Sequence, residues 1–259
     1  MYPATLCAVL ACLLLAAVNP AFANVPDGLH IFLLIGQSNM AGRGTVAAQD
    51  REPIPRVFML TKSLTWVPAA DPIHFDKTIA GVGIGRTFAK VLATANPSAS
   101  IGLIPAAMGG SSLDEWKPGS DLYNEAIRRT KAALKNGKLR GILWHQGESD
   151  THDDGQASTY RARFVPFIRQ LRADLSAPDV PVLVGQLSET FDNPHRKTVD
   201  EQLALIPLLV PHSGFVSSAG LRHQERQAHF NAEELREFGR RYGYTFLMLD
   251  PTWTPAPGH

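Results

Sequence analysis

A serine stands directly after the first strongly apolar segment that could form a buried strand. Residues 30–35 are apolar apart from His30 and are followed by Gly36-Gln37-Ser38-Asn39-Met40. In a turn after a buried strand, a serine can expose its hydroxyl and point its backbone N–H into the same cleft. A nucleophilic serine requires both. The block is not a G-x-S-x-G elbow, because Met40 stands where the second glycine would be. A lone serine here also fits a simple turn cap, so its role depends on the other polar segments.

Two further polar segments follow apolar runs in the same way. Met108-Gly109-Gly110-Ser111 comes after residues 101–105, and paired glycines let a backbone approach a ligand and point N–H groups at it. A tight turn would use the same glycines. His145-Gln146-Gly147-Glu148-Ser149-Asp150 comes after residues 141–144. Packing alone does not explain this run, because each occluded polar group needs a partner.

A metal site is the competing interpretation of the last segment. His145 and Glu148 are too few ligands, and the sequence has no H-E-x-x-H helix, so we expect no metal. His229 lies just ahead of a predicted helix start, which can hold it in place. With a serine in a cleft elsewhere, His229 is the candidate general base.

The elements that must position these residues alternate along the chain. Short apolar runs predict strands buried on both faces, at residues 30–35, 101–105, 141–144 and 180–184. The spacing of apolar residues predicts helices between and around them, over residues 84–92, 122–134 and 160–175. Pro166 should kink the last of these or mark its start.

The final helix has a well-marked start and completes the pattern. Asn231 and Glu234 have the spacing of a capping box, and Phe230 and Leu235 that of a hydrophobic staple. Alternation of strands and helices predicts an α/β fold, a three-layer α/β/α sandwich with a mostly parallel central sheet. Ligands in such folds bind at the carboxyl ends of the strands, where the three polar segments above would lie.

The composition limits the class of protein and its partners. Of 259 residues, 44% are hydrophobic and 19% charged, which argues against disorder, a multi-span membrane protein and a coiled coil. Lys and Arg number 25 against 24 Asp and Glu, a formal net charge of +1, so no field attracts nucleic acid or anionic lipid. We expect a single domain over residues 24–259, since no repeat or low-complexity linker divides the chain.

Residues 1–23 have the features of a secretory signal peptide. They contain no charged side chain, and an apolar run is followed by the breaker Asn19-Pro20 and an A-x-A cleavage site ending at Ala23. The run is too short to span a bilayer of ~30 Å. We therefore expect a secreted or periplasmic protein without membrane insertion once the leader is removed. Both cysteines, Cys7 and Cys12, lie in the leader, so the mature chain would have no disulfide and would depend on its core.

Together the four polar segments resemble the SGNH hydrolase superfamily. More narrowly, they resemble its sialate O-acetylesterase and carbohydrate esterase family six branch, which includes acetyl xylan esterases. The matching blocks occur in the family's order: G-Q-S-N-M at 36–40, A-x-x-G-G-S ending at Ser111, W-H-Q-G-E-S-D at 144–150 and H-F-N-A-E at 229–233. The resemblance implies a flavodoxin-like sheet and removal of acetyl groups from carbohydrate hydroxyls without a metal or other cofactor.

The resemblance also implies a role for each matching residue. Ser38 would be the nucleophile, and His229 the general base and later the general acid. The oxyanion hole would consist of the Ser38 backbone N–H, one N–H of Gly109-Gly110 and the side-chain amide of Gln146. These roles agree with the chemistry, because a serine alcohol needs a base and a tetrahedral oxyanion needs fixed donors, each worth ~3 kcal/mol.

A basic residue stands where the superfamily carries the carboxylate that completes its Ser-His-acid triad. The superfamily carries Asp three residues before the histidine, whereas this chain has Arg226, whose guanidinium would oppose an imidazolium. Three arrangements stay open: Glu148 supplies the carboxylate, Glu225 reaches His229, or the site works as a Ser-His dyad. We favour Glu148, which follows a strand end facing the same cleft, with Asp150 of the same loop as a further candidate.

The balanced charge favours a neutral acetylated glycan, such as acetylated xylan or a related plant glycan, over a sialic acid. Arg43 and Trp116 follow the first and second polar segments and are candidates for substrate contacts. Arg43 would otherwise close a loop salt bridge, and Trp116 would otherwise belong to the core.

Two alternative functions stay open. One is another esterase of the superfamily, either a sialate O-acetylesterase or a short-chain or lipolytic enzyme. The other is a non-catalytic carbohydrate-binding relative, which Arg226 suggests and the presence of Ser38, Gln146 and His229 argues against.

Overall fold

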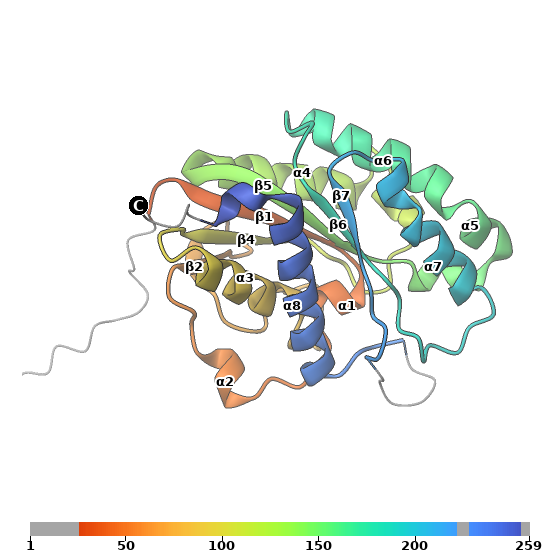
Figure 1. Cartoon of the computed structure of the whole chain (residues 1–259), viewed down its shortest axis with the longest axis horizontal. Coiled ribbons are helices and arrows are strands. Elements are labelled where there is room, and N and C mark those ends of the chain that lie inside the picture. Colours follow the sequence, from red (N-terminus) through yellow and green to blue (C-terminus); the bar gives the residue numbers. More distant parts are fainter. Residues whose placement is uncertain (1–25, 222–227, 255–259) are drawn as a thin grey trace, which may run out of the picture.

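A computed structural model of the chain describes residues 26–221 and 228–254. Within these residues, seven strands form one sheet in the order β3-β2-β4-β1-β5-β6-β7 (Figure 1). Neighbouring strands pair in parallel, except that β3 runs antiparallel to β2. The strands are β1 (Leu29–Gly36), β2 (Val57–Leu60), β3 (Trp66–Pro68), β4 (Ile101–Pro105), β5 (Gly137–His145), β6 (Val182–Gly185) and β7 (Ser213–Val216).

Helices cover both faces of the sheet. In Figure 1, α3 and α8 lie together on one face, and α4 and α6 lie on the other. The α-helices of the described residues are α1 (Ser38–Ala41), α2 (Ala48–Arg51), α3 (Ile84–Ala95), α4 (Asp121–Ala133), α5 (Asp154–Ser158), α6 (Tyr160–Asp174), α7 (Arg196–Ala204) and α8 (Ala232–Leu249). Short 3-10 turns include η2 (Leu113–Trp116) and η4 (Glu148–His152). The predicted three-layer α/β/α sandwich with a mostly parallel sheet is confirmed.

The central strand shows why the chain folds in three layers. Side chains along a strand alternate between its two faces. In β1, Ile31, Leu33 and Ile35 join the core that packs under α4, α6 and α7, while Phe32 and Leu34 join the core under α3 and α8. A strand that is apolar on both faces is stable only when helices shield both of them.

The predicted elements match the structure with small changes of boundary. The four predicted strands correspond to β1, β4, β5 and β6, and the predicted helices to α3, α4, α6 and α8. Asn231 accepts from the Glu234 N–H and Glu234 accepts from the Asn231 N–H, which confirms the capping box. The helix α6 begins at Tyr160 and contains Pro166, so the proline does not mark its start.

The three polar segments meet because their strands are neighbours. The order β4-β1-β5 places the carboxyl ends of these parallel strands at one edge of the sheet. The segment after β4 continues along β1, since the Met108 N–H donates to the Gly36 carbonyl at 2.9 Å. No helix of the described residues is long and apolar enough to cross a membrane. The expected leader, residues 1–23, lies outside the described residues.

Candidate active site

Ser38 and His229 face each other in a pocket at the carboxyl edge of the sheet. The His229 Nε2 atom lies 2.9 Å from the Ser38 Oγ atom, although 191 positions separate them in the chain. The pocket encloses about 290 Å³ and is lined by Gln37, Ser38, Arg43, Lys77, Ile79, Gly109, Gly110, Glu148, Ser149, His152, Phe191, Ala228 and His229. All four polar segments thus contribute to one cavity, and three of them do so from the strand ends where the sequence predicts them.

The turn that presents Ser38 depends on a glycine. Gly36 ends β1 with φ +127°, and a Cβ there would lie 2.1 Å from the His145 carbonyl oxygen. The next residue, Gln37, donates its N–H to that same carbonyl at 2.8 Å. Ser38 then begins α1, so its own N–H has no partner within the helix. The close approach of β1 and β5 therefore places the serine hydroxyl and its N–H at the same point.

Asn39 connects the nucleophile to the base. Its Nδ2 donates to the Ala228 carbonyl at 2.8 Å, and its Oδ1 accepts from the Phe230 N–H at 3.1 Å. The backbone on either side of His229 is thus hydrogen-bonded to the residue next to Ser38. The sequence does not reveal this role, because Asn39 is one residue of the serine motif and its partners lie far away along the chain.

Glu148 lies beneath Asn39. Its Oε1 accepts from Asn39 Nδ2 at 2.5 Å and is 3.4 Å from His145 Nε2, while its Oε2 is buried without a hydrogen-bond partner among the described residues. Burial disfavours the ionised carboxyl, but the contacts with His145 and Asn39 outweigh it and hold the pKa of Glu148 below its usual value. Glu148 therefore brings negative charge to the site, and its described contacts are with Asn39 and His145. Glu225 and Arg226 lie outside the described residues, so the predictions that concern them stay predictions.

The Gly109-Gly110 segment is held by a buried ion pair. Asp76 Oδ2 accepts from the Gly109 N–H at 3.0 Å and from Arg43 Nη2 at 2.7 Å. Burial would raise the pKa of Asp76, but the bonds from Arg43 and Gly109 lower it below its usual value. The Gly109 N–H is thus already engaged, which leaves Gly110 as the glycine of the pair that can offer an N–H to a ligand. Of the two interpretations of Arg43, the loop salt bridge is the one observed.

Gln146 lies behind the pocket wall instead of lining it. Its fully buried Nε2 lies within 3.2 Å of Gln37 Oε1, the Ser111 carbonyl and Asp150 Oδ2, and its Oε1 accepts from Tyr160. An amide with these partners has no hydrogen left for a substrate oxygen. The geometry gives Gln146 a positioning role, in contrast to the oxyanion-hole role that the resemblance implies.

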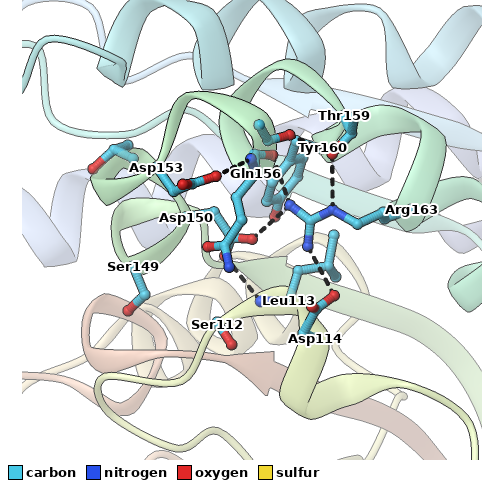
Figure 2. Close-up of polar contacts among 12 residues, drawn as sticks. Ser112, Leu113, Asp114, Ser149, Asp150, Asp153, Gln156, Thr159, Tyr160 and Arg163 are labelled. Atoms are coloured by element: carbon cyan, nitrogen blue, oxygen red, sulfur yellow. Dashed lines mark hydrogen bonds and ion pairs between the residues drawn. The ribbon is translucent and has the colours of Figure 1, made fainter.

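Asp150 has structural contacts as well. Its Oδ2 accepts from the Leu113 N–H at 2.9 Å, and its Oδ1 from Arg163 at 2.7 Å, as Figure 2 shows. Arg163 in turn reaches Asp114 at 3.1 Å. These bonds hold η2 and α6 to the loop after β5 and leave Asp150 no contact with the base among those the structure describes.

Trp116 belongs to the core. Its ring is fully buried, and its Nε1 donates to Ser111 Oγ at 3.0 Å. The expected substrate contact is therefore wrong, because a buried indole offers no face to a sugar. Three exposed lining residues carry no motif in the sequence, namely Lys77, Ile79 and His152, and the half-buried Phe191 lines the pocket as well. They come from loops and from the end of the short turn η4, where no periodicity marks them.

No cluster of three or more His, Cys, Asp or Glu side chains suited to a metal ion is found within residues 26–221 and 228–254. The described lining of the pocket brings together a hydroxyl, an imidazole, a buried carboxylate and backbone N–H groups. This set suits acyl transfer to a serine.

The sequence matches the model of one protein family and is similar to a protein named as a probable carbohydrate esterase. The model of the family described as carbohydrate esterase, sialic acid-specific acetylesterase, matches residues 28–248. A protein of Arabidopsis thaliana named as a probable carbohydrate esterase is 36% identical over 174 residues, which cover 60% of this chain and 67% of the relative.

Solved structures agree with that match. The crystal structure of an Arabidopsis thaliana protein superposes with a TM-score of 0.80 at 30% identity, covering 86% of this chain and 99% of that one. The crystal structure of NanS superposes with a TM-score of 0.74 over 88% of this chain and 99% of its own, at 19% identity, which shows a shared fold.

Proposed function

The chain belongs to the carbohydrate esterase family of sialic acid-specific acetylesterases and is a carbohydrate acetylesterase; from this premise we propose that it cleaves O-acetyl esters of carbohydrates by a serine mechanism. The observation that supports this mechanism is the 2.9 Å contact between Ser38 Oγ and His229 Nε2 in a pocket beside two glycines. A base within hydrogen-bond reach of a hydroxyl is the geometry of an activated nucleophile.

The steps follow from this contact. His229 Nε2 takes the proton of Ser38 as Oγ attacks the acetyl carbonyl carbon, and a tetrahedral oxyanion forms. The oxyanion collapses, His229 returns the proton to the departing sugar oxygen, and the acetyl group stays on Ser38. Water, deprotonated by His229, then attacks the acetyl-enzyme, and acetate leaves as Ser38 regains its proton.

The oxyanion is stabilised by backbone donors. We assign the hole to the N–H groups of Ser38 and Gly110. The Ser38 N–H begins α1 without a partner inside the helix, and Gly110 lines the pocket while Gly109 is bonded to Asp76. Gln146 supports this wall from behind through the Ser111 carbonyl.

The negative charge that supports His229 is assigned to Glu148. It is the buried carboxylate of the pocket lining, whereas Arg226 occupies the family's usual acid position. Replacing Glu148 by Gln should lower kcat for an aryl acetate by about tenfold or more, and Glu225→Gln should leave kcat nearly unchanged. The reverse ranking would transfer the role to Glu225.

The substrate proposed is an acetylated neutral glycan, for example acetylated xylan. A pocket of about 290 Å³ has room for a short acyl group and one sugar unit. One observation favours the sialate alternative: Lys77 is an exposed cation at the pocket, where a sugar carboxylate would meet it.

Acetate release from a panel of acetylated xylan, mannan, chitin oligomers and O-acetyl sialic acid tests the substrate. Preference for the neutral polymers, unchanged in Lys77→Ala, supports the proposal. Preference for O-acetyl sialic acid that Lys77→Ala removes would replace it by the sialate alternative. Binding of these glycans without any acetate release would instead indicate a non-catalytic relative.

We also propose that residues 1–23 direct export, since their pattern matches a leader. The mass of the protein recovered outside the cytoplasm should correspond to a chain that starts at Asn24. A full-length chain recovered only from the cytoplasm would contradict this.

A further inference from the structure

We propose that Asn39 is a positioning residue that clamps His229 against Ser38, and that Glu148 acts on the base through Asn39. This inference rests on the proposed serine mechanism and adds a residue to which no motif role is attached. It follows from three hydrogen bonds to one buried amide.

The amide of Asn39 is fully used. One Nδ2 hydrogen goes to the Ala228 carbonyl and the other to Glu148 Oε1, while Oδ1 accepts from the Phe230 N–H. The side chain is fully buried, so no water competes for these groups. The planar amide of Asn39 is thus hydrogen-bonded to the backbone of Ala228 and of Phe230, the residues directly before and after the proposed base.

The partners also determine which way the amide faces. A carboxylate and a backbone carbonyl accept hydrogen bonds and cannot donate them, whereas a backbone N–H can only donate. The NH₂ of Asn39 must therefore face Glu148 and Ala228, and its oxygen must face Phe230. If Glu148 were removed, one of the two acceptors that enforce this orientation would be lost.

The neighbouring contacts explain why a clamp is useful. Phe230 is buried against His145 and Phe238, and Asn231 caps α8, so the chain is anchored just after His229. On the other side, the described anchor is the bond from Asn39 to the Ala228 carbonyl at 2.8 Å. The position of Nε2 relative to Ser38 therefore depends on both bonds, and a displacement of ~1 Å between reacting groups can cost about 10²-fold in rate.

Glu148 is placed to reinforce the clamp. Its 2.5 Å contact with Asn39 is a charge-assisted hydrogen bond, which is shorter and stronger than one between neutral groups. The same oxygen lies 3.4 Å from His145, a fully buried residue on β5. The carboxylate is therefore held on the core side of Asn39, with the amide between it and the backbone that carries His229.

An isosteric swap tests the inference. We would measure kcat and KM for an aryl acetate in Asn39→Asp, Glu148→Gln and the double variant. Asn39→Asp keeps the acceptor for Phe230 but loses both donors and sets two carboxylates together. We expect kcat to fall about 100-fold with KM nearly unchanged. In the double variant, the amide at position 148 can donate to the carboxylate at position 39, so kcat should recover about tenfold relative to Asn39→Asp.

Other outcomes would overturn the inference. If Glu148 contacted the His229 imidazole as a direct triad acid, the double variant would be slower than either single variant. If Asn39 were only a structural residue, Asn39→Asp would lose no more kcat than Asn96→Ala, a control that removes a comparable long-range bond to the Trp253 carbonyl far from the pocket. Folding of each variant is checked by its denaturation midpoint. Ser38→Ala distinguishes a failure of the serine mechanism from a failure of the inference about Asn39. If Ser38→Ala retains activity, the serine mechanism itself fails, whatever the effect of Asn39.

Discussion

Replacing Asp76 by Asn should weaken both the fold and catalysis, because one carboxylate holds Arg43 and the Gly109 N–H together. The Asp76 side chain is fully buried and that of Arg43 is 6% exposed, with 2.7 Å between Oδ2 and Nη2. Breaking a buried ion pair from one side costs 3–5 kcal/mol. Since Asn keeps one acceptor oxygen, we expect a loss of about 3 kcal/mol in the free energy of unfolding at pH 7.

The effect on catalysis follows from the loop that Asp76 holds. The neutral amide in Asp76→Asn would hold Arg43 and the Gly109 N–H less firmly than the carboxylate does, so the N–H of Gly110 would be less well oriented toward the oxyanion. One misplaced oxyanion donor costs about 10²-fold in kcat. The assay combines guanidinium unfolding with aryl acetate turnover of the folded variant, with kcat and KM measured separately.

The chain offers a matched control in Asp50. This buried carboxylate accepts from Arg236 at 2.6 Å and from the Ala47 N–H at 2.9 Å, the same pattern as at Asp76, but it does not line the pocket. Asp50→Asn should destabilise the fold and leave kcat unchanged. Equal kcat losses in the two variants, or an unchanged stability in Asp76→Asn, would refute the reasoning.

The pH dependence provides a second check on Asp76. Its pKa is lower in the folded chain than its usual value, so its contribution to stability is present above the unfolded value near 4 and is lost as pH falls through the folded value. The difference in stability between the wild type and Asp76→Asn should therefore shrink below about pH 4.

Three further changes have defined outcomes. Gly109→Ala would place a Cβ 2.1 Å from Arg43 Nη2 and displace the loop. On the same aryl acetate, kcat should fall with KM nearly unchanged. An unchanged kcat would contradict the close contact between Gly109 and Arg43. Burial raises the pKa of Asp71 to about 7, so the folded state loses stability as pH rises toward and through 7. Denaturation curves should therefore show that the free energy of unfolding of Asp71→Asn, relative to that of the wild type, rises by roughly 2–4 kcal/mol from pH 4 to pH 8. A difference that stays constant over this range would contradict the expectation. Arg163→Ala removes one bond to Asp150 (Figure 2) and leaves Asp150 bonded to Leu113 and Gln146. It should lower the melting temperature while kcat falls less than about tenfold, so a larger loss would place Arg163 closer to the chemistry.

The fold was predictable where apolar patterns are long. Runs such as residues 30–35 and the spacing in α6 indicate buried strands and amphipathic helices without reference to the rest of the chain. The strands β2, β3 and β7 were missed, because they are short and, unlike the four-residue β6, do not belong to an apolar run that extends beyond the strand itself. The helix α7 was missed as well, since only Val199, Asp200 and Leu203 of its residues are buried.

The site was predictable where a polar group follows a strand end. The α/β pattern places Ser38, Gly110 and Glu148 at the carboxyl edge of the sheet. That they meet there depends on the strand order β4-β1-β5, which the structure shows and the pattern does not fix. Asp76 could not be found in this way, since it lies in a loop and its partners Arg43 and Gly109 are each 33 positions away. The burial of Gln146 and Trp116 likewise depends on packing between distant loops, which spacing along the chain does not reveal.

The central claim is that Ser38 carries the acetyl group during turnover. Acid quenching of the enzyme during hydrolysis of an acetylated substrate, followed by mass spectrometry of its peptides, tests this directly. We predict an acetyl group on the peptide that contains Ser38, and neither acetylation nor acetate release in Ser38→Ala. Acetate release by Ser38→Ala at the wild-type rate, or an acetyl group trapped only on another residue, would contradict the mechanism.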